Sequence, residues 1–170
     1  MITARVKINQ KELRAYLFYA TFHSFQGILS ILLGLLTIAA GVFYLTQGNK
    51  NGIFFFCMAA VFFIVQPLMI MLQAKMQSKH AVFQQETNYE FDEKELRAWQ
   101  EGVEPAGVTW ENLYRVVKSR QYYFIFTDKY RANIVPAESF TNEGGAAEFD
   151  RLIQRILPKE KKKGFPKGQA

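Results

Sequence analysis

The fold is decided by an uncharged stretch that reads Gly52-Ile-Phe-Phe-Phe-Cys-Met-Ala-Ala-Val-Phe-Phe-Ile-Val65. It belongs to a run from Asn51 to Ala74 that contains no Asp, Glu, Lys or Arg. A second run of this kind extends from Ala15 to Asn49, and only Lys50 separates the two. A bilayer core about 30 Å thick needs roughly 20 apolar residues at about 1.5 Å of rise each. Residues 15–80 are therefore predicted to form a transmembrane helical hairpin.

The two spans are expected at about residues 25–46 and 52–73, the first within one continuous helix from about Gln10 to Tyr44. Four Lys/Arg precede the first span, two closely follow the second, and one lies in the turn. This distribution predicts a multi-pass protein of the cell membrane with both termini in the cytoplasm. A cleaved signal peptide is the alternative for the first run, but the run is long and a second span follows it.

The net charge of +6 is unevenly distributed along the 170 residues. Residues 83–157 contain nine Lys/Arg and thirteen Asp/Glu, whereas residues 158–170 contain five Lys and one Glu. An acidic folded region makes nucleic acid a poor partner. Residues 158–170 are expected to form a flexible basic tail, either solvated or in contact with anionic lipid headgroups. The lysines concerned are Lys159, Lys161, Lys162, Lys163 and Lys167.

Small residues recur along the first span at steps of three and four, which places them on one stripe of a helix. Such a stripe lets another helix approach closely in lipid. The second span supplies bulky phenylalanines, so we expect its side chains to fill the groove; a homodimer seam is the alternative. The stripe consists of Gly27, Ser30, Gly34, Thr37 and Gly41.

Gln66 and Pro67 interrupt the second span. Pro67 has no N–H to donate to the carbonyl of Phe63, which predicts a kink or another donor at this point. Folding the hairpin about its turn brings Gln66 to the depth of Leu33, close to Ser30, Gly34 and Thr37. We therefore expect a polar clasp between Gln66 and the stripe.

The remaining sequence predicts strands and one helix. Residues 1–14 read as a short strand followed by the start of a helix, and residues 81–157 as five or six short antiparallel strands with turn residues between them. Phe149, Leu152, Ile153 and Ile156 have the spacing of an amphipathic helix, which Pro158 ends. The predicted class is an α+β membrane protein with a small barrel or half-barrel like a pleckstrin-homology (PH) domain and a C-terminal helix.

Four segments of this β-rich region carry a resemblance to a known family. They are Tyr89-Glu-Phe91, Val108-Thr-Trp110-Glu-Asn-Leu-Tyr114, Tyr122-Tyr-Phe-Ile-Phe126 and Ile134-Val-Pro136. Together with the N-terminal strand and the two spans, the chain resembles the YcxB-like family of bacterial membrane proteins. The resemblance implies an architecture and a location, and it carries no catalytic residues.

No motif predicts catalysis, a cofactor or a metal site. The chain has two histidines and one cysteine, and it lacks the glycine patterns of nucleotide-binding loops. The carboxylates of Asp92, Glu93 and Glu95 fall in a turn without a partner group. We therefore expect a non-enzymatic, membrane-anchored interaction or regulatory module whose partner is a protein or lipid headgroups. A small accessory or pore-forming subunit acting through the hairpin is the alternative, and an enzyme acting on a membrane substrate is a third, less favoured class.

Overall fold

The structure is a computed structural model that describes residues 1–165. Its contacts divide the chain into two compact units. One is helical and consists of Leu13–Gln77, and the other joins Met1–Glu12 to the chain from Ser78 onward. The β-rich region expected at residues 81–157 thus belongs to one unit with the N-terminal strand, and the helical unit is inserted between two parts of it in the sequence.

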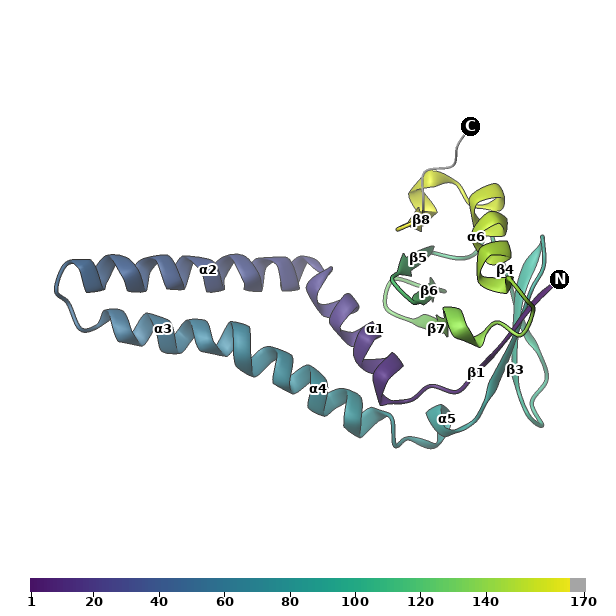
Figure 1. Cartoon of the computed structure of the whole chain (residues 1–170), viewed down its shortest axis with the longest axis horizontal. Helices are drawn as coiled ribbons and strands as arrows, with labels where there is room; N and C mark the ends of the chain where they lie inside the picture. The colour runs from purple at the N-terminus through teal and green to yellow at the C-terminus, as the bar shows by residue number, and fades with distance from the viewer. Residues whose placement is uncertain (166–170) are drawn as a thin grey trace. The chain divides into compact units, whose positions relative to one another are not determined.

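The helical unit contains two helices that are long and apolar enough to cross a membrane (Figure 1). Its elements are α1 (Gln10–Phe22, from Leu13 onward), α2 (Phe25–Thr46), α3 (Gly52–Ala60), the π-helical turn η1 (Val61–Val65) and α4 (Gln66–Gln77). α3, η1 and α4 run on as one helical segment of 26 residues. The second helix thus extends a turn beyond the expected residue 73.

The single helix predicted from Gln10 to Tyr44 is wrong, because the chain breaks between α1 and α2. Ser24 adopts an extended backbone and its Oγ accepts a hydrogen bond from the N–H of Gly27 at 3.0 Å, which caps the start of α2. The same Oγ donates to the carbonyl of Thr21 at 2.6 Å. A Cβ on Gly27 would lie 1.9 Å from that carbonyl oxygen, so only glycine fits the bend.

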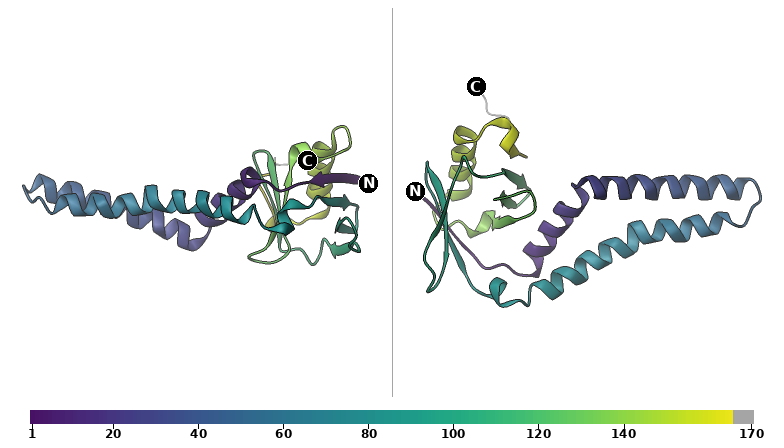
Figure 2. Two further views of the ribbon diagram at one scale, coloured as in Figure 1. Left: turned by 90° about the horizontal axis from the view of Figure 1, so that it is seen from below. Right: turned by 180° about the vertical axis from the view of Figure 1, so that it is seen from behind.

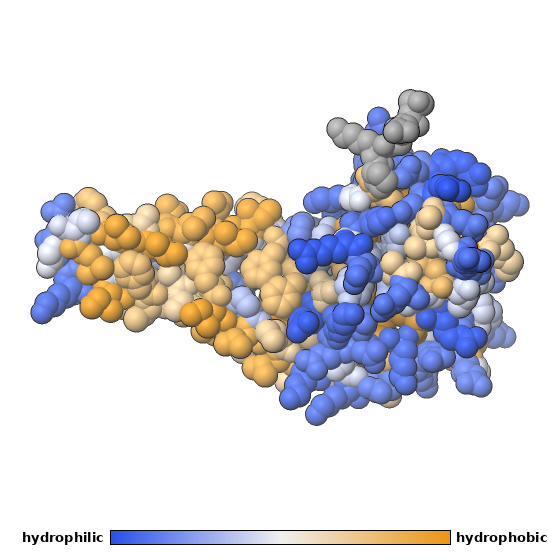
Figure 3. All heavy atoms as spheres, viewed as in Figure 1, coloured by the Kyte–Doolittle hydropathy of each residue, from blue (hydrophilic) through white to orange (hydrophobic). Residues whose placement is uncertain are grey.

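The surface of the helical unit is apolar. Figure 3 shows hydrophobic residues gathered over α2 and the helices that follow it, while hydrophilic residues predominate over the sheets. Only 11% of the most apolar window of each long helix is buried. A helix in the core of a water-soluble domain would bury most of this surface, so these two helices are not core helices of that kind.

The first sheet has the order β1-β2-β3-β4 and is antiparallel throughout. Its strands are β1 (Ile2–Val6), β2 (Thr87–Phe91), β3 (Glu95–Gln100) and β4 (Ala106–Thr109). β1 pairs with β2 from Ile2 opposite Phe91 to Val6 opposite Thr87. A short helix, α5 (Ala81–Gln84), precedes β2.

The second sheet has the order β7-β6-β5-β8. β5 (Arg115–Ser119), β6 (Tyr122–Phe126) and β7 (Ala132–Pro136) form an antiparallel meander, followed by the 3-10 turn η2 (Ala137–Ser139). The two-residue strand β8 (Lys162–Lys163) pairs with β5 in parallel after the 3-10 turn η3 (Lys159–Lys161). Residues 159–163 are thus ordered against the sheet, which corrects the expected flexible tail at those positions.

Helix α6 (Gly145–Ile156) packs between the sheets through Phe149. Figure 2 shows the ribbon in two further views. The Phe149 ring centroid lies 4.6 Å from that of Phe91 in β2 and 5.0 Å from that of Tyr123 in β6. The predicted apolar face of this helix is confirmed, since Phe149, Leu152 and Ile153 are buried and Ile156 is partly buried against the same core.

The sheets do not close into a barrel. Each is a separate four-stranded ladder within residues 1–165, and α6 fills the space between them. The α+β class, the antiparallel meander and the C-terminal helix are as predicted, whereas a closed barrel is not formed.

Candidate functional site

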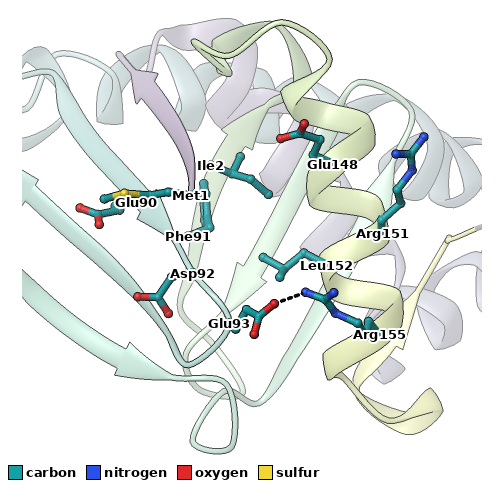
Figure 4. Close-up of a pocket in the computed structure, with 10 residues that line it drawn as sticks. All are labelled: Met1, Ile2, Glu90, Phe91, Asp92, Glu93, Glu148, Arg151, Leu152 and Arg155. Carbon is teal, nitrogen blue, oxygen red and sulfur yellow. Dashed lines mark hydrogen bonds and ion pairs between the residues drawn. The ribbon is translucent and has the colours of Figure 1, made fainter.

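A groove of about 450 Å³ lies between the end of β2 and helix α6 (Figure 4). Ile2, Phe91 and Leu152 give it an apolar floor, and charged side chains stand around the floor. Its lining comprises Met1, Ile2, Glu90, Phe91, Asp92, Glu93, Glu148, Arg151, Leu152 and Arg155.

The turn between β2 and β3 shapes one wall of this groove. Asp92 Oδ1 accepts hydrogen bonds from the N–H of Glu95 at 2.9 Å and of Lys94 at 2.7 Å. The indole of Trp110 donates to the Asp92 carbonyl at 2.9 Å. The two backbone N–H groups, from Glu95 first and then Lys94, lower the pKa of the Asp92 carboxyl. Asp92 therefore orders the turn, and Glu93 at its tip is free to reach across the groove.

Glu93 and Arg155 form an ion pair across one end of the groove, with Oε1 and Nη2 2.5 Å apart. Both side chains are largely exposed, at 74% and 66%, so water screens the pair and its contribution to stability is small. Further along α6, Glu148 and Arg151 make no ion pair with any of residues 1–165. The walls thus present charged groups that another molecule can engage.

The groove is lined by carboxylates and guanidinium groups around an apolar floor. Within the part of the chain that the structure describes, no group of three or more His, Cys, Asp or Glu side chains could hold a metal ion. Neither histidine lines the groove, and Cys57 belongs to α3. An apolar floor between charged walls suits a short amphipathic segment, which can bury one side and pair its polar groups at the edges.

The stripe of small residues lies in α2, where Gly27, Gly34 and Gly41 are the buried residues. A Cβ on Gly34 would lie 2.6 Å from the ring of Phe63 and 3.2 Å from Cβ of Phe62. A Cβ on Gly41 would lie 2.9 Å from the ring of Phe56. Phenylalanines of the second helix therefore occupy the space that these glycines leave, the arrangement expected from the sequence.

The polar members of the stripe have partners within the hairpin. Thr37 donates its hydroxyl to the Gly34 carbonyl at 2.7 Å. Ser30 Oγ donates to Gln66 Oε1 at 2.8 Å, where the clasp was expected. Just before Pro67 the helix widens into the π-helical turn η1, in which the N–H of Gln66 reaches back to the carbonyl of Val61. This wider turn accommodates the missing N–H of the proline.

Two lysines of the basic segment contact the α+β unit itself, and the lipid contact expected for this segment stays a prediction. Lys161 Nζ donates to the Glu111 carbonyl at 2.7 Å, and Lys162 Nζ donates to the Gln154 carbonyl at 2.6 Å. These ammonium groups hold the segment against its own domain. Lys159 and Lys163 are exposed, and Lys167 lies outside the described residues.

Two features of the α+β unit escaped the sequence analysis. The groove is one, because its lining comes from three separate segments of the chain. The other is a polar cluster in which Asp150 pairs with Lys118 and accepts a hydrogen bond from the Tyr123 hydroxyl at 2.9 Å. Burial first, and then this hydrogen bond, raise the pKa of Tyr123. No sequence motif marks either feature.

Comparison with known proteins gives one match. A family model described as YcxB-like protein matches residues 91–153, from the groove floor at Phe91 to Ile153 in α6. The match covers β3 to β7 and most of α6, well under half of the 170 residues, and it leaves out the long helices. No curated protein and no solved structure matches the chain.

Proposed function

We propose that this protein is an integral membrane protein that carries a cytoplasmic, non-enzymatic interaction module. The observation that carries the proposal is the exposed apolar surface of the two long helices. Their 22 and 26 residues correspond to roughly 33 and 39 Å of helix at 1.5 Å per residue, enough to cross a hydrocarbon core of about 30 Å. Water would oppose the exposure of so much apolar surface, and lipid would not.

The cytoplasmic placement of both termini rests on charge. Positive residues flank the pair of helices, with Arg14 before the first and Lys75 and Lys79 at the end of the second, whereas the intervening turn has Lys50 alone. In this topology the α+β unit lies in the cytoplasm, where its groove is open to proteins and to lipid headgroups.

The α+β unit has the character of a binding module. Its meander strands and its C-terminal helix are the parts that a PH-like domain would share, and we propose that architecture in an open form. Its groove offers an apolar floor with carboxylates and guanidinium groups around it, and no histidine or cysteine of residues 1–165 lines it. Partner binding at this groove is therefore the proposed activity.

The membrane proposal is tested by extraction and labelling. Alkaline carbonate should leave the full-length protein in the membrane pellet. In a Cys57→Ser background, an impermeant maleimide should label Asn49→Cys on intact cells and should label Glu143→Cys only after lysis. Release by carbonate, or labelling of Glu143→Cys on intact cells, would contradict the proposed location or topology.

The groove is tested by photo-crosslinking in cells. A photoreactive amino acid at Glu148, which lines the groove, should give a reproducible adduct. The neighbouring exposed Ala147, which does not line the groove, is the matched control and should give none. Equal adducts at both positions, or none at Glu148, would remove the groove from the proposal. Adducts found only from positions in α2 or α4 would instead favour an accessory subunit that acts through the hairpin.

A further inference from the structure

Gln66 is a polar side chain near the middle of the second apolar helix. It lies 14 residues after Gly52 and 11 before Gln77, or roughly 21 and 16 Å along the axis at 1.5 Å per residue. If the hairpin spans the bilayer, as proposed above, this amide lies close to the midplane. Polar groups at that depth have no water to satisfy them.

The hydrogen bonds within the hairpin satisfy only part of this amide. A glutamine side chain carries two N–H donors and one oxygen with two acceptor positions. Ser30 occupies one acceptor position of Oε1, and neither N–H has an acceptor among residues 1–165. If the amide were turned so that its nitrogen faced Ser30, one N–H would still lack a partner. The side chain is only partly buried, so a group from outside the hairpin can reach it.

The glycine stripe does not supply this external contact. Phe56, Phe62 and Phe63 of the same hairpin already occupy the space beside Gly34 and Gly41. The homodimer seam considered for the stripe is therefore closed at these positions. The amide of Gln66 is the polar group of the second helix that still offers donors at mid-depth.

We propose that two copies of the hairpin associate through reciprocal hydrogen bonds between their Gln66 side chains. The amide is self-complementary, because each copy can donate one N–H to the free acceptor position of Oε1 on the other. A two-fold axis brings the same residue from both copies together and satisfies a donor on each. In lipid, interhelical hydrogen bonds of this kind favour association because the alternative is an unsatisfied polar group.

The test is co-purification of two differently tagged full-length copies from nanodiscs under reducing conditions, so that Cys57 cannot cross-link them. Wild-type copies should co-purify, and Gln66→Leu should reduce the yield at least tenfold. Gln73→Leu is the matched control, because it makes the same change at an exposed position of the same helix. It should leave the yield unchanged.

A second variant separates association from hairpin packing. Ser30→Ala removes the internal hydrogen bond but keeps both N–H donors of Gln66, so co-purification should persist. Equal losses in Ser30→Ala and Gln66→Leu would overturn the proposal, as would wild-type copies that do not co-purify. Carbonate extraction of the same samples keeps the two proposals distinguishable: monomers retained in the membrane contradict the pairing only, whereas release from the membrane contradicts the membrane location on which the pairing depends.

Discussion

The two units of this protein use phenylalanine in opposite surroundings. In the α+β unit, Phe91 and Phe149 are completely buried in a core shared by both sheets and α6. In the helical unit, Phe54 is 64% exposed and Phe43 is 61% exposed. The first unit buries its apolar residues against itself, as a domain in water must. The second exposes them, which is the arrangement that helices lying in lipid, as proposed above, would have.

This difference predicts the largest mutational effect at Phe149. Replacing it with alanine removes contacts to Phe91, Trp110 and Tyr123 and leaves a cavity, which should cost about 3–5 kcal/mol. Denaturation of detergent-solubilised protein, monitored by tryptophan fluorescence, measures this loss. Trp110 reports on the site because its ring centroid lies 6.5 Å from that of Phe149. Phe54→Ala is the control in the other unit and should cost under about 1 kcal/mol. Comparable losses for both would mean that Phe54 is part of a core.

The next largest effect is expected where the helical unit is tightly packed. Gly34→Leu would place a branched side chain where Phe63 and Phe62 already lie, and overpacking of this kind costs about 1–3 kcal/mol. Thermal unfolding followed by circular dichroism in detergent should show a lower transition temperature. Ala39→Leu adds similar bulk at an exposed position of α2 and should have little effect. If the two variants unfolded alike, the stripe would have no packing role.

The sequence was informative where one physical pattern dominated a segment. The 3-4 spacing of small residues in α2 and the bulk of the second helix were enough to predict which face of α2 meets phenylalanines. Alternation over residues 2–8 predicted the strand that the structure has at Ile2–Val6, but not that β2 would be its partner, because pairing depends on residues more than 80 positions away. The α+β unit could therefore be predicted as a set of elements, but not as two separate sheets.

Local interactions that compete with a strong pattern were harder to see. The apolar run hid the break at Ser24, although a serine three residues before Gly27 is a reasonable cap. The lysine-rich composition of residues 159–163 suggested solvent exposure. Pairing with the edge of β5 and two ammonium–carbonyl hydrogen bonds order these residues instead. The groove was not predictable, since it exists only after α6 and β2 are placed side by side.

The stability of the α+β unit should also depend on pH through the buried hydroxyl of Tyr89. Burial raises the pKa of Tyr89 to about 12 from an ordinary value of 10.0. Above pH 10 the unfolded chain loses this proton while the folded protein keeps it, so stability should fall as the pH rises from 10 to about 12. Tyr89→Phe should weaken this fall, as measured by urea denaturation at pH 8, 10 and 11. The wild type and Tyr89→Phe share Tyr123 and all lysines, so the two should differ only by the effect of Tyr89. If their stability changed with pH in the same way, the burial of the Tyr89 hydroxyl would be contradicted.

The smallest effect is expected at the ion pair that crosses the groove. Glu93→Gln removes a charge that is 74% exposed, so the α+β unit should lose at most about 1 kcal/mol, and less in 1 M salt. Asp150→Asn is the comparison, because Asp150 is 17% exposed, pairs with Lys118 and accepts from Tyr123; its loss should be clearly larger. Urea denaturation of both variants measures the contrast in stability.

Photo-crosslinking in cells supplies a second comparison of the two variants. The adduct formed from a photoreactive amino acid at Glu148 should change in Glu93→Gln and persist in any Asp150→Asn protein that is folded. A large loss of stability in Glu93→Gln, with the crosslink unaltered, would make the pair a structural element and not part of a binding surface.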